Sequence, residues 1–291
     1  MSKLVLYTIP QSVWASAARL AIYELGYEDS VEFMDINLAK GENFLPEFLA
    51  KASPNPNGTL PTLQTPEGTL TSTTDVIKYL VVHAHTGMVM KSGDATLVES
   101  LHSDALDPNF AKQLARNDEE LAAKADAFLL AFLEGRQRAL KKQSARPEGA
   151  PYKAFYDAKK ASNGEFLAIV DGSAFAGAKE AFFDKARAHH ENVRSFIYDE
   201  LPRVLFNSQA FPGPDSDNGH FLSGDLPGEA DFHLAAWLAR IVSTCGADAA
   251  GDASGKAKAA FGGPLPPTVL AYWSAWVARP SWGRVYGQGL H

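Results

Sequence analysis

The stretch NPNGTLPTL, residues 55–63, ends like a β-strand but contains a proline where the strand begins. Pro61 stands between Leu60 and Thr62, and proline lacks the backbone N–H that a strand needs for its ladder of hydrogen bonds. Proline is tolerated at the first residue of a strand or on a sheet edge. Taken alone, the stretch therefore fits an ordinary loop turn followed by an edge strand.

Strand and helix patterns alternate on both sides of this stretch, over residues 1–86. Runs rich in β-branched and aromatic residues predict strands, and apolar residues at helical spacing, such as Trp14, Ala18 and Ile22, predict helices. In chain order we predict a strand at 3–10, a helix at 12–26, a strand at 31–37, a short helix at 41–53, a strand at 59–65, a hairpin strand after Gly68 and a helix at 73–84. This order predicts a small mixed sheet flanked by helices.

The rest of the chain is helical in pattern. Long helices are predicted at 115–142, 176–206, 228–245 and 268–279. The helix at 228–245 is strongly apolar, so we expect it at the centre of the core. Two segments are rich in small residues, glycine or proline: 144–151 is predicted to be a linker or loop, and 246–263 a surface loop.

Composition argues against several classes of protein. The formal net charge of -7 argues against nucleic-acid binding, which relies on clustered Lys and Arg. With one cysteine, Cys245, the chain has no internal disulfide and no cysteine-based zinc site. No signal peptide is recognisable, and no apolar run reaches the roughly 18 residues of a membrane span. We expect a cytoplasmic protein without a metal, membrane or nucleic-acid partner, and with surface positions for His83, His85, His189 and His190.

The layout and several motifs together resemble the glutathione transferase family. The motifs are NPNGTLP at 55–61, TSTTDVIKYL at 71–80, FLSGDLPGEADFHLAAWL at 221–238 and ARPSWGRVY at 278–286. The resemblance implies a thioredoxin-like α/β domain over 1–86 that binds glutathione, and an all-α helical bundle over 95–291. The helical part is longer than is usual in the family, with insertions near 144–175 and 246–263. This length indicates a divergent class with an enlarged C-terminal domain.

The resemblance gives Pro61 a different meaning. In the family this proline has a cis peptide bond, and the backbone N–H and carbonyl of the residue before it, here Leu60, pair with the cysteinyl part of glutathione. Gly58 would provide the turn. Only about 5–6% of X–Pro bonds in folded proteins are cis, so the resemblance is what predicts this geometry. NPNGTLP is then interpreted as an edge that binds a peptide ligand.

Glutathione transfer needs the thiolate, and a free thiol has a pKa of about 8.5. The resemblance places Ser12, which opens the first helix, at the family's catalytic Ser or Cys position. Ser12 would donate a hydrogen bond to the thiolate, assisted by the positive end of the helix. The alternative for Ser12 is a plain helix N-cap. Ser16, one turn into the helix, and Tyr7, on the first strand, are alternative thiolate contacts.

The γ-glutamyl end of glutathione is implied to meet the start of the helix at 73–84. Thr73 matches the family's Ser or Thr, whose hydroxyl holds a carboxylate together with the N–H groups of the helix start. Ser72 replaces the usual acidic or amide residue of the pair. Asp75 compensates for that change, or it caps the helix.

The glycyl carboxylate usually meets a cation in the 40–52 region. Asn43 and Phe44 occupy the aligned positions in this chain, which is a departure from the family pattern. Lys40 and Lys51 are the substitutes, and a solvated loop lysine is the alternative for each.

For the second substrate, Trp14 and Phe110 are candidates for the walls of the acceptor site, and core packing is the alternative for both. Asp231 resembles the family's buried helix-capping aspartate, so we assign it to folding. The sequence predicts a glutathione transferase that joins glutathione, its cosubstrate, to hydrophobic electrophiles in a detoxification reaction.

Other activities stay open at this point. Peroxidase, ether-cleaving lyase and isomerase reactions are not separated from conjugation by the sequence. The alternative function is a non-catalytic glutathione- or ligand-binding or regulatory protein of the same fold. A homodimer is the family norm.

Overall fold

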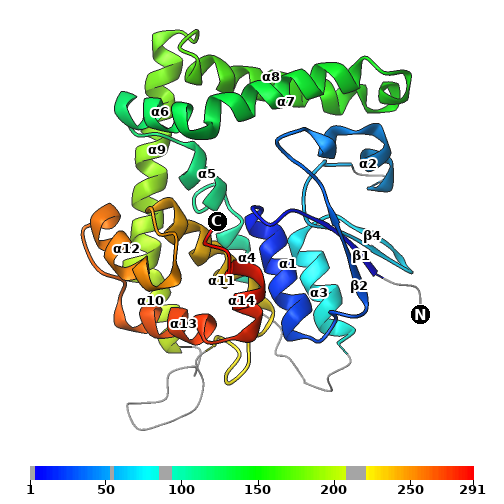
Figure 1. Cartoon of the computed structure of the whole chain (residues 1–291). Helices are drawn as coiled ribbons and strands as arrows, with labels where there is room; N and C mark the ends of the chain where they lie inside the picture. The colour runs from blue at the N-terminus through cyan, green and yellow to red at the C-terminus, as the bar shows by residue number, and fades with distance from the viewer. Residues whose placement is uncertain (1–3, 53–55, 85–93, 208–220) are drawn as a thin grey trace. The chain divides into compact units, whose positions relative to one another are not determined.

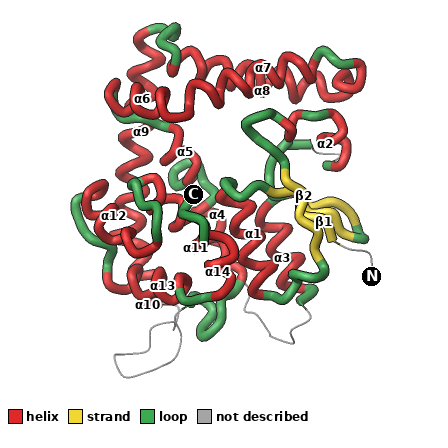
Figure 2. Tube along the Cα trace, viewed as in Figure 1, coloured by secondary structure: helices red, strands yellow, loops and turns green. Residues whose placement is uncertain are grey.

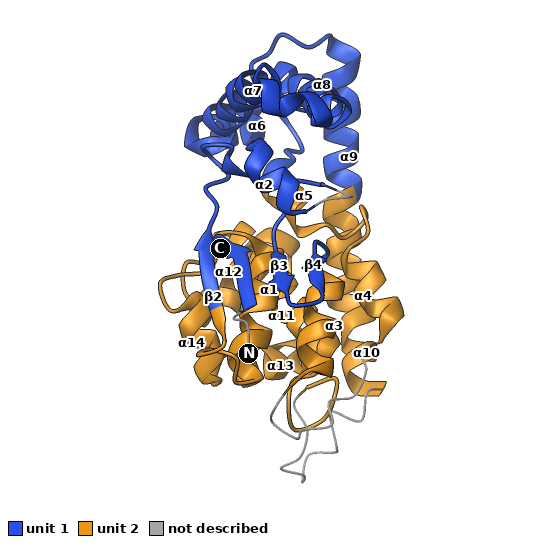
Figure 3. Cartoon of the chain, turned by 90° about the vertical axis from the view of Figure 1, so that its right-hand side faces the viewer, with its two compact units in different colours: residues 1–9, 32–72, 113–188 blue, residues 10–31, 73–112, 189–291 orange. Residues whose placement is uncertain are grey.

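The computed structural model describes residues 4–52, 56–84, 94–207 and 221–291 (Figure 1). The chain forms two compact units, each built from segments that lie apart in the sequence (Figure 3). Unit 1 comprises residues 1–9, 32–72 and 113–188; unit 2 comprises residues 10–31, 73–112 and 189–291.

A four-stranded sheet has the strand order β2-β1-β3-β4. Its strands are β1 (Leu4–Thr8), β2 (Val31–Asp35), β3 (Thr62–Thr65) and β4 (Gly68–Leu70). β3 is antiparallel to both β1 and β4, and its Leu63 lies opposite Leu6 on one side and Leu70 on the other. Leu6 and Leu63 are fully buried, so the register places apolar side chains in the core. In Figure 2 the strands gather in this one sheet, and most of the other described residues are helical.

The Leu60–Pro61 peptide bond is cis, as the resemblance implied. β3 begins only after the proline, at Thr62. The backbone N–H and carbonyl of Leu60 form no hydrogen bond with any residue that the structure describes. The edge at Leu60 is therefore not paired with another strand.

In the helical part of unit 1, the long helices α7 (Leu130–Ser144) and α8 (Lys153–Val170) lie side by side (Figure 1). The elements of this part are the 3₁₀ turn η1 (Glu42–Phe44), α2 (Pro46–Lys51), α6 (Asp118–Lys124), the π-helical turn η2 (Ala125–Leu129), α7 (Leu130–Ser144), the 3₁₀ helix η3 (Pro147–Tyr152), α8 (Lys153–Val170) and α9 (Ala176–Ser195), which runs on into unit 2. α7 and α8 pack on η1 and α2 through a buried cluster that contains Phe44, Leu49, Leu140 and Tyr156. The Tyr156 hydroxyl donates to the Phe44 carbonyl at 2.7 Å.

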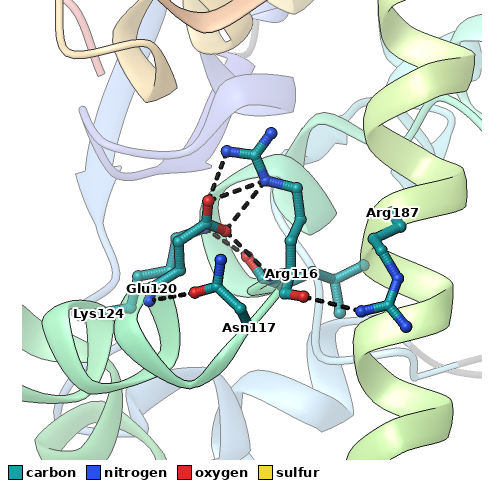
Figure 4. Close-up of polar contacts among 6 residues, drawn as sticks. Arg116, Asn117, Glu120, Lys124 and Arg187 are labelled. Carbon is teal, nitrogen blue, oxygen red and sulfur yellow. Dashed lines mark hydrogen bonds and ion pairs between the residues drawn. The ribbon is translucent and has the colours of Figure 1, made fainter.

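Polar contacts fix the chain where it enters α6 (Figure 4). Arg116 binds Glu120 through its side chain and its backbone N–H, the latter at 2.9 Å. Asn117 caps α6 by accepting the Glu120 N–H at 2.9 Å. Arg187 on α9 donates to the Arg116 carbonyl at 3.0 Å, which ties the start of α6 to α9.

Unit 2 is helical and is built around α11 (Glu229–Thr244), which is buried along most of its length. Its other elements are α1 (Val13–Glu24), α3 (Thr73–Val82), α4 (Ala95–Leu101), α5 (Pro108–Gln113), the π-helical turn η4 (Phe196–Glu200), α10 (Leu201–Asn207), the 3₁₀ turn η5 (Ala250–Asp252), α12 (Ala253–Phe261), α13 (Pro267–Val277) and α14 (Pro280–Tyr286). Trp237 on α11 is fully buried, and its indole N–H donates to the Leu106 carbonyl at 2.7 Å. This confirms the prediction that 228–245 is central to the core.

Asp231 holds the start of α11. Its fully buried carboxylate accepts the N–H groups of Gly228 at 2.9 Å, Leu222 at 2.8 Å and Ser223 at 3.3 Å. These bonds satisfy backbone donors that a helix start leaves free. Asp231 is therefore part of the folding scaffold, as predicted.

Three sequence predictions were wrong. The segment 144–151, predicted as a linker or loop, begins with the last residue of α7, and its residues 147–151 belong to the 3₁₀ helix η3, which Pro147 starts. The segment 246–263 is not a loop throughout: it contains α12, because Ala253 and Ala257 lie one turn apart and bury one face of a run rich in helix-forming residues. His189 is buried, with its Nε2 3.0 Å from the Asp107 carbonyl, because it lies on the packed face of α9. His83 is exposed as expected, and His85 lies outside the described residues.

The described part of the chain contains no helix long and apolar enough to span a membrane. It also contains no group of three or more His, Cys, Asp or Glu side chains that could hold a metal ion.

Candidate functional site

In unit 1, the loop that leads to the cis proline is held from two sides. Asn43, on η1, donates from its side-chain amide to the Gly58 carbonyl at 2.7 Å. Gly58 has a φ of 62°, and a Cβ there would meet Phe155 Cζ at 3.0 Å and the Asn43 carbonyl oxygen at 3.1 Å. Only glycine fits both the left-handed backbone and the close approach. These contacts fix the loop at Gly58, two residues before Leu60.

In unit 2, Ser12 is the N-cap of α1. Its extended backbone, with φ of -88° and ψ of 116°, lets its Oγ accept the Ala15 N–H at 3.4 Å. The side chain is partly exposed, and its O–H donates to no acceptor within the described residues. Ser12 is thus a helix cap with an unused donor, so the capping and the catalytic interpretations are compatible.

The Ser16 hydroxyl is already engaged. Ser16 is fully buried; its Oγ donates to the Pro10 carbonyl at 3.3 Å and lies 3.0 Å from Nε2 of His291. Nothing of this side chain faces solvent, so a bound ligand would have to displace these partners.

The Tyr7 hydroxyl is engaged as well. Tyr7 lies on β1, is 5% exposed, and donates to the side-chain carbonyl of Gln64 at 2.9 Å. Its ring packs edge-on against Phe48, and the ammonium of Lys51 lies 5.5 Å from the ring centre. Tyr7 therefore behaves as a packed residue of the sheet.

The remaining predicted glutathione contacts lie near element ends. Thr73 is the first residue of α3 and is buried, and Ser72 before it is exposed. Asp75 is exposed in the first turn of α3. Lys40 is exposed in the turn before η1, and Lys51 is exposed at the end of α2.

Trp14 and two histidines form a cluster in unit 2. The Trp14 ring on α1 stacks on His102 with centroids 3.7 Å apart, and His102 Nε2 lies 2.9 Å from His233 Nδ1 on α11. Burial lowers the pKa of His102 to about 4 and that of His233 to about 3. Both rings are therefore neutral at neutral pH, and one donates its N–H to the other. Phe110, the other acceptor-site candidate, contacts His189 edge-on at 5.8 Å between centroids.

Arg240 is a functional candidate that sequence reasoning missed. It lies on α11, is 3% exposed, and donates to the carbonyl of Gln11, the residue before Ser12. Its Nε is buried and has no hydrogen-bond partner among the described residues. Burial lowers the pKa of Arg240. The one signal in the sequence is an arginine inside the apolar run AAWLARIV, where an unpaired cation is costly.

Comparison with known families accounts for the first part of the chain. Residues 6–86 match the family model described as "Glutathione S-transferase, N-terminal domain". The match contains the cis proline, Ser12, Ser72 and Thr73.

Glutathione S-transferases also occur among the relatives of this chain. Glutathione S-transferase 2 of Saccharomyces cerevisiae is 43% identical over 68 residues, which are 23% of this chain and 28% of that relative's length.

The structural comparison covers nearly the whole chain. The crystal structure of Gtt2 from Saccharomyces cerevisiae matches with a TM-score of 0.52 and 18% identity, over 97% of this chain and 99% of that one. A glutathione transferase homolog from Lodderomyces elongisporus, crystallised with two GSH per subunit, matches with a TM-score of 0.50 and 16% identity, over 98% of each chain. The fold is that of glutathione S-transferases: a thioredoxin-like N-terminal domain followed by a mostly helical C-terminal part.

Proposed function

We propose that the protein is a glutathione transferase in which Ser12 stabilises the thiolate of bound glutathione. The observation that carries the proposal is the unused O–H of Ser12, which caps α1 through its oxygen and has no acceptor among the described residues. The hydroxyls of the two rivals already donate, that of Ser16 to Pro10 and that of Tyr7 to Gln64.

Two positive groups near Ser12 support the same role. The N-terminus of α1 carries a partial positive charge from its unpaired N–H groups. The guanidinium of Arg240 binds the Gln11 carbonyl, next to Ser12 in the chain, and an arginine keeps its charge even when buried. A thiol beside such groups ionises more readily, so more thiolate is present at neutral pH.

Glutathione itself is proposed to bind as a short peptide. The backbone of Leu60 pairs with its cysteinyl residue in the manner of an added β-strand. Thr73 and the N–H groups at the start of α3 hold the γ-glutamyl carboxylate, and Ser72 adds a further hydroxyl. Lys40 and Lys51 are the lysines proposed for the glycyl end.

In the reaction, the thiolate sulfur gives an electron pair to the electrophilic atom of the acceptor, and a new bond to sulfur forms. The leaving group departs with its bonding pair, or an activated alkene takes a proton from solvent after the addition. Trp14, partly exposed and stacked on His102, and Phe110 are the aromatic candidates for contact with a hydrophobic acceptor. Peroxidase, lyase and isomerase reactions start from the same thiolate, so product analysis must separate them.

The homodimer and the cytoplasmic location implied by the resemblance also stay proposals. Analytical ultracentrifugation of the full chain tests the first, because a homodimer has a measured molar mass twice that of the chain. Imaging of a fluorescent fusion in cells tests the second.

The test of the proposed function is steady-state kinetics with glutathione and a chloronitrobenzene acceptor. Ser12→Ala is expected to lower kcat/KM about tenfold to a hundredfold, because a hydrogen bond to a charged group contributes roughly 1.5–3 kcal/mol. Ser16→Ala and Tyr7→Phe are expected to change kcat/KM less than threefold. An unchanged rate in Ser12→Ala would show that another group holds the thiolate.

Capping has to be separated from catalysis, because Ser12→Ala also removes a helix cap. Ser12→Asp keeps the cap, since Asp caps as well as Ser does, but it places a negative charge beside the thiolate. Ser12→Thr keeps both the cap and the hydroxyl. If the hydroxyl stabilises the thiolate, Asp is less active than Ala and Thr retains activity; if only the cap matters, Asp restores activity.

A further inference from the structure

The region 40–52, where the resemblance implies a glycyl-binding cation, has an amide and an aromatic residue at the aligned positions. Phe44 and Asn43 occupy the aligned positions, and both are buried. Of the two lysines in this region, Lys51 lies beside the Tyr7 ring and Lys40 is exposed in its turn. Neither lysine contacts the Phe44 ring within the described residues, and the cation beside this ring belongs to another element.

An arginine of α7 lies at that position. The guanidinium carbon of Arg136 is 4.9 Å from the ring centre of Phe44 and 5.3 Å from that of Phe132. Its Nε donates to the side-chain carbonyl of Asn163 at 3.3 Å, a neutral partner. Arg136 forms no ion pair within the described residues, although it is partly buried.

A second cation, Lys159 on α8, lies close to the first. Its ammonium is 5.8 Å from the ring centre of Phe155, and the Phe155 and Phe44 rings are 6.3 Å apart between centroids. Lys159 is partly buried and forms no ion pair with any carboxylate in the described ranges. Burial, and then the charge of Arg136, lower the pKa of Lys159, and burial lowers the pKa of Arg136.

Two carboxylates of the same helices have other partners. Glu134 pairs with Arg138 at 3.3 Å, and Asp157 pairs with Lys160 at 3.0 Å and with Lys153. Two like charges in a partly buried aromatic setting repel each other, and the contacts with the rings offset only part of the solvation that they lose. Such a pair is a ready site for an anion, because the anion would relieve both costs.

The aromatic residues under the two cations connect them to the loop that carries Leu60, within unit 1. Phe155, next to Lys159, closes against Gly58, where a Cβ would come within 3.0 Å of its ring. Asn43, next to Phe44, binds the Gly58 carbonyl at 2.7 Å. Phe155 thus contacts both the Lys159 ammonium and the loop that carries Leu60.

We propose that Arg136 and Lys159 form a carboxylate-binding site on α7 and α8, above the rings of Phe44 and Phe155. The site deepens the proposed function and rests on it. Two sources can supply the carboxylate: the glycyl end of glutathione, or an acceptor that carries a carboxylate on an aromatic group. α7 and α8 lie outside the N-terminal domain, so the helical part contributes to ligand recognition.

The first experiment is isothermal titration of the full chain with glutathione and with its glycyl ethyl ester. If the site holds the glycyl carboxylate, Arg136→Gln and Lys159→Gln each weaken glutathione binding about tenfold or more, as expected for loss of a charge-assisted hydrogen bond. Esterification then weakens binding to the unaltered protein by a similar factor. It weakens binding to Arg136→Gln little further, because the interaction is already lost.

The second experiment measures kcat/KM for ethacrynic acid and for its uncharged ester at saturating glutathione. If the site holds an acceptor carboxylate, glutathione binding is unchanged in both variants. The kcat/KM for the acid falls about tenfold, while that for the ester stays within twofold. If the variants change neither glutathione binding nor the ratio of acid to ester, the site does not exist.

Controls keep the outcomes distinct. Arg138→Gln removes a charge on the same helix that is exposed and paired with Glu134, and it is expected to change neither readout. Arg136→Gln also loses the hydrogen bond to Asn163 and could fail to fold for that reason. The side chain of Lys159 forms no hydrogen bond with the described residues, so Lys159→Gln tests the site independently. If the unaltered protein binds no glutathione, both the proposed function and the site are wrong. If it binds glutathione and the variants equal it in glutathione affinity and in the ratio of acid to ester, only the site is wrong.

Discussion

At the scale of single residues, the partners of each hydroxyl distinguish the thiolate candidates. Ser12, Ser16 and Tyr7 carry similar groups in neighbouring parts of the sequence, but only the O–H of Ser12 lacks an acceptor within the described ranges. Sequence could predict the position of Ser12 through the family pattern. It could not predict the partners of the other two hydroxyls. Ser16 donates to Pro10, and Tyr7 donates to Gln64, a contact between residues 57 positions apart.

The His102–His233 pair makes stability depend on pH. The pKa of His233 is lowered by burial from 6.5 to about 3, so the unfolded chain takes up its proton at a higher pH than the folded chain does. Its contribution is fully present above about pH 6.5 and is lost as the pH falls toward 3. Between pH 7 and pH 5 this one group is expected to lower the unfolding free energy by about 2 kcal/mol. Urea denaturation at the two pH values measures the change.

The variant His233→Asn tests this account, because it removes the titrating ring. Its unfolding free energy is expected to change about 2 kcal/mol less between pH 7 and pH 5 than that of the unaltered protein. His83→Asn, at an exposed position, is the matched control and should keep the original pH dependence. The explanation is wrong if His233→Asn also keeps the pH dependence of the unaltered protein.

At the scale of elements, α7 approaches the turn before η1 through glycines. Gly41 has a φ of 68°, and a Cβ there would lie 2.3 Å from Cβ of Ala139. Gly135 faces the Ala39 carbonyl, which a Cβ would meet at 3.1 Å. This close contact brings α7, and with it Arg136, onto the segment that contains Phe44.

Gly41→Ala is expected to destabilise the protein by about 2–5 kcal/mol. Roughly 1–2 kcal/mol comes from a left-handed backbone at a non-glycine residue, and about 1–3 kcal/mol from the clash with Ala139. Gly172→Ala is the matched control, because Gly172 has a φ of 80° and open space around its Cβ position, so only the backbone cost applies. Thermal or urea unfolding measures the loss of stability in both variants. Equal losses in Gly41→Ala and Gly172→Ala would mean that the contact with α7 does not contribute to stability.

Helices with strong periodicity were predictable, and weakly apolar ones were not. The apolar run of α11 predicted its central burial because nearly every residue in it can lie in a core. α12 escaped prediction because its small residues and glycine resemble a loop, and only the burial of Ala253 and Ala257 against the rest of unit 2 favours the helix. Tertiary packing overrides local propensity in such segments.

At the scale of the whole molecule, the order of elements over residues 1–86 and the cis proline agree with the sequence prediction, because local patterns and one strong motif determine them. Contacts between distant segments could not be predicted. His102 and His233 are 131 residues apart, and Arg136 meets Phe44 only because α7 folds back onto η1. The division at 1–86 and 95–291, with insertions near 144–175 and 246–263, stays a prediction.

The most direct test of the central claim is the pKa of the thiol in bound glutathione, measured by ultraviolet absorbance of the thiolate during a pH titration of the complex. The account predicts a pKa well below the value of about 8.5 for a free thiol in the unaltered protein. It predicts a return toward that value in Ser12→Ala, with Ser16→Ala and Tyr7→Phe unchanged. A bound thiol with the pKa of free glutathione, or a lowered pKa that survives Ser12→Ala, would contradict it.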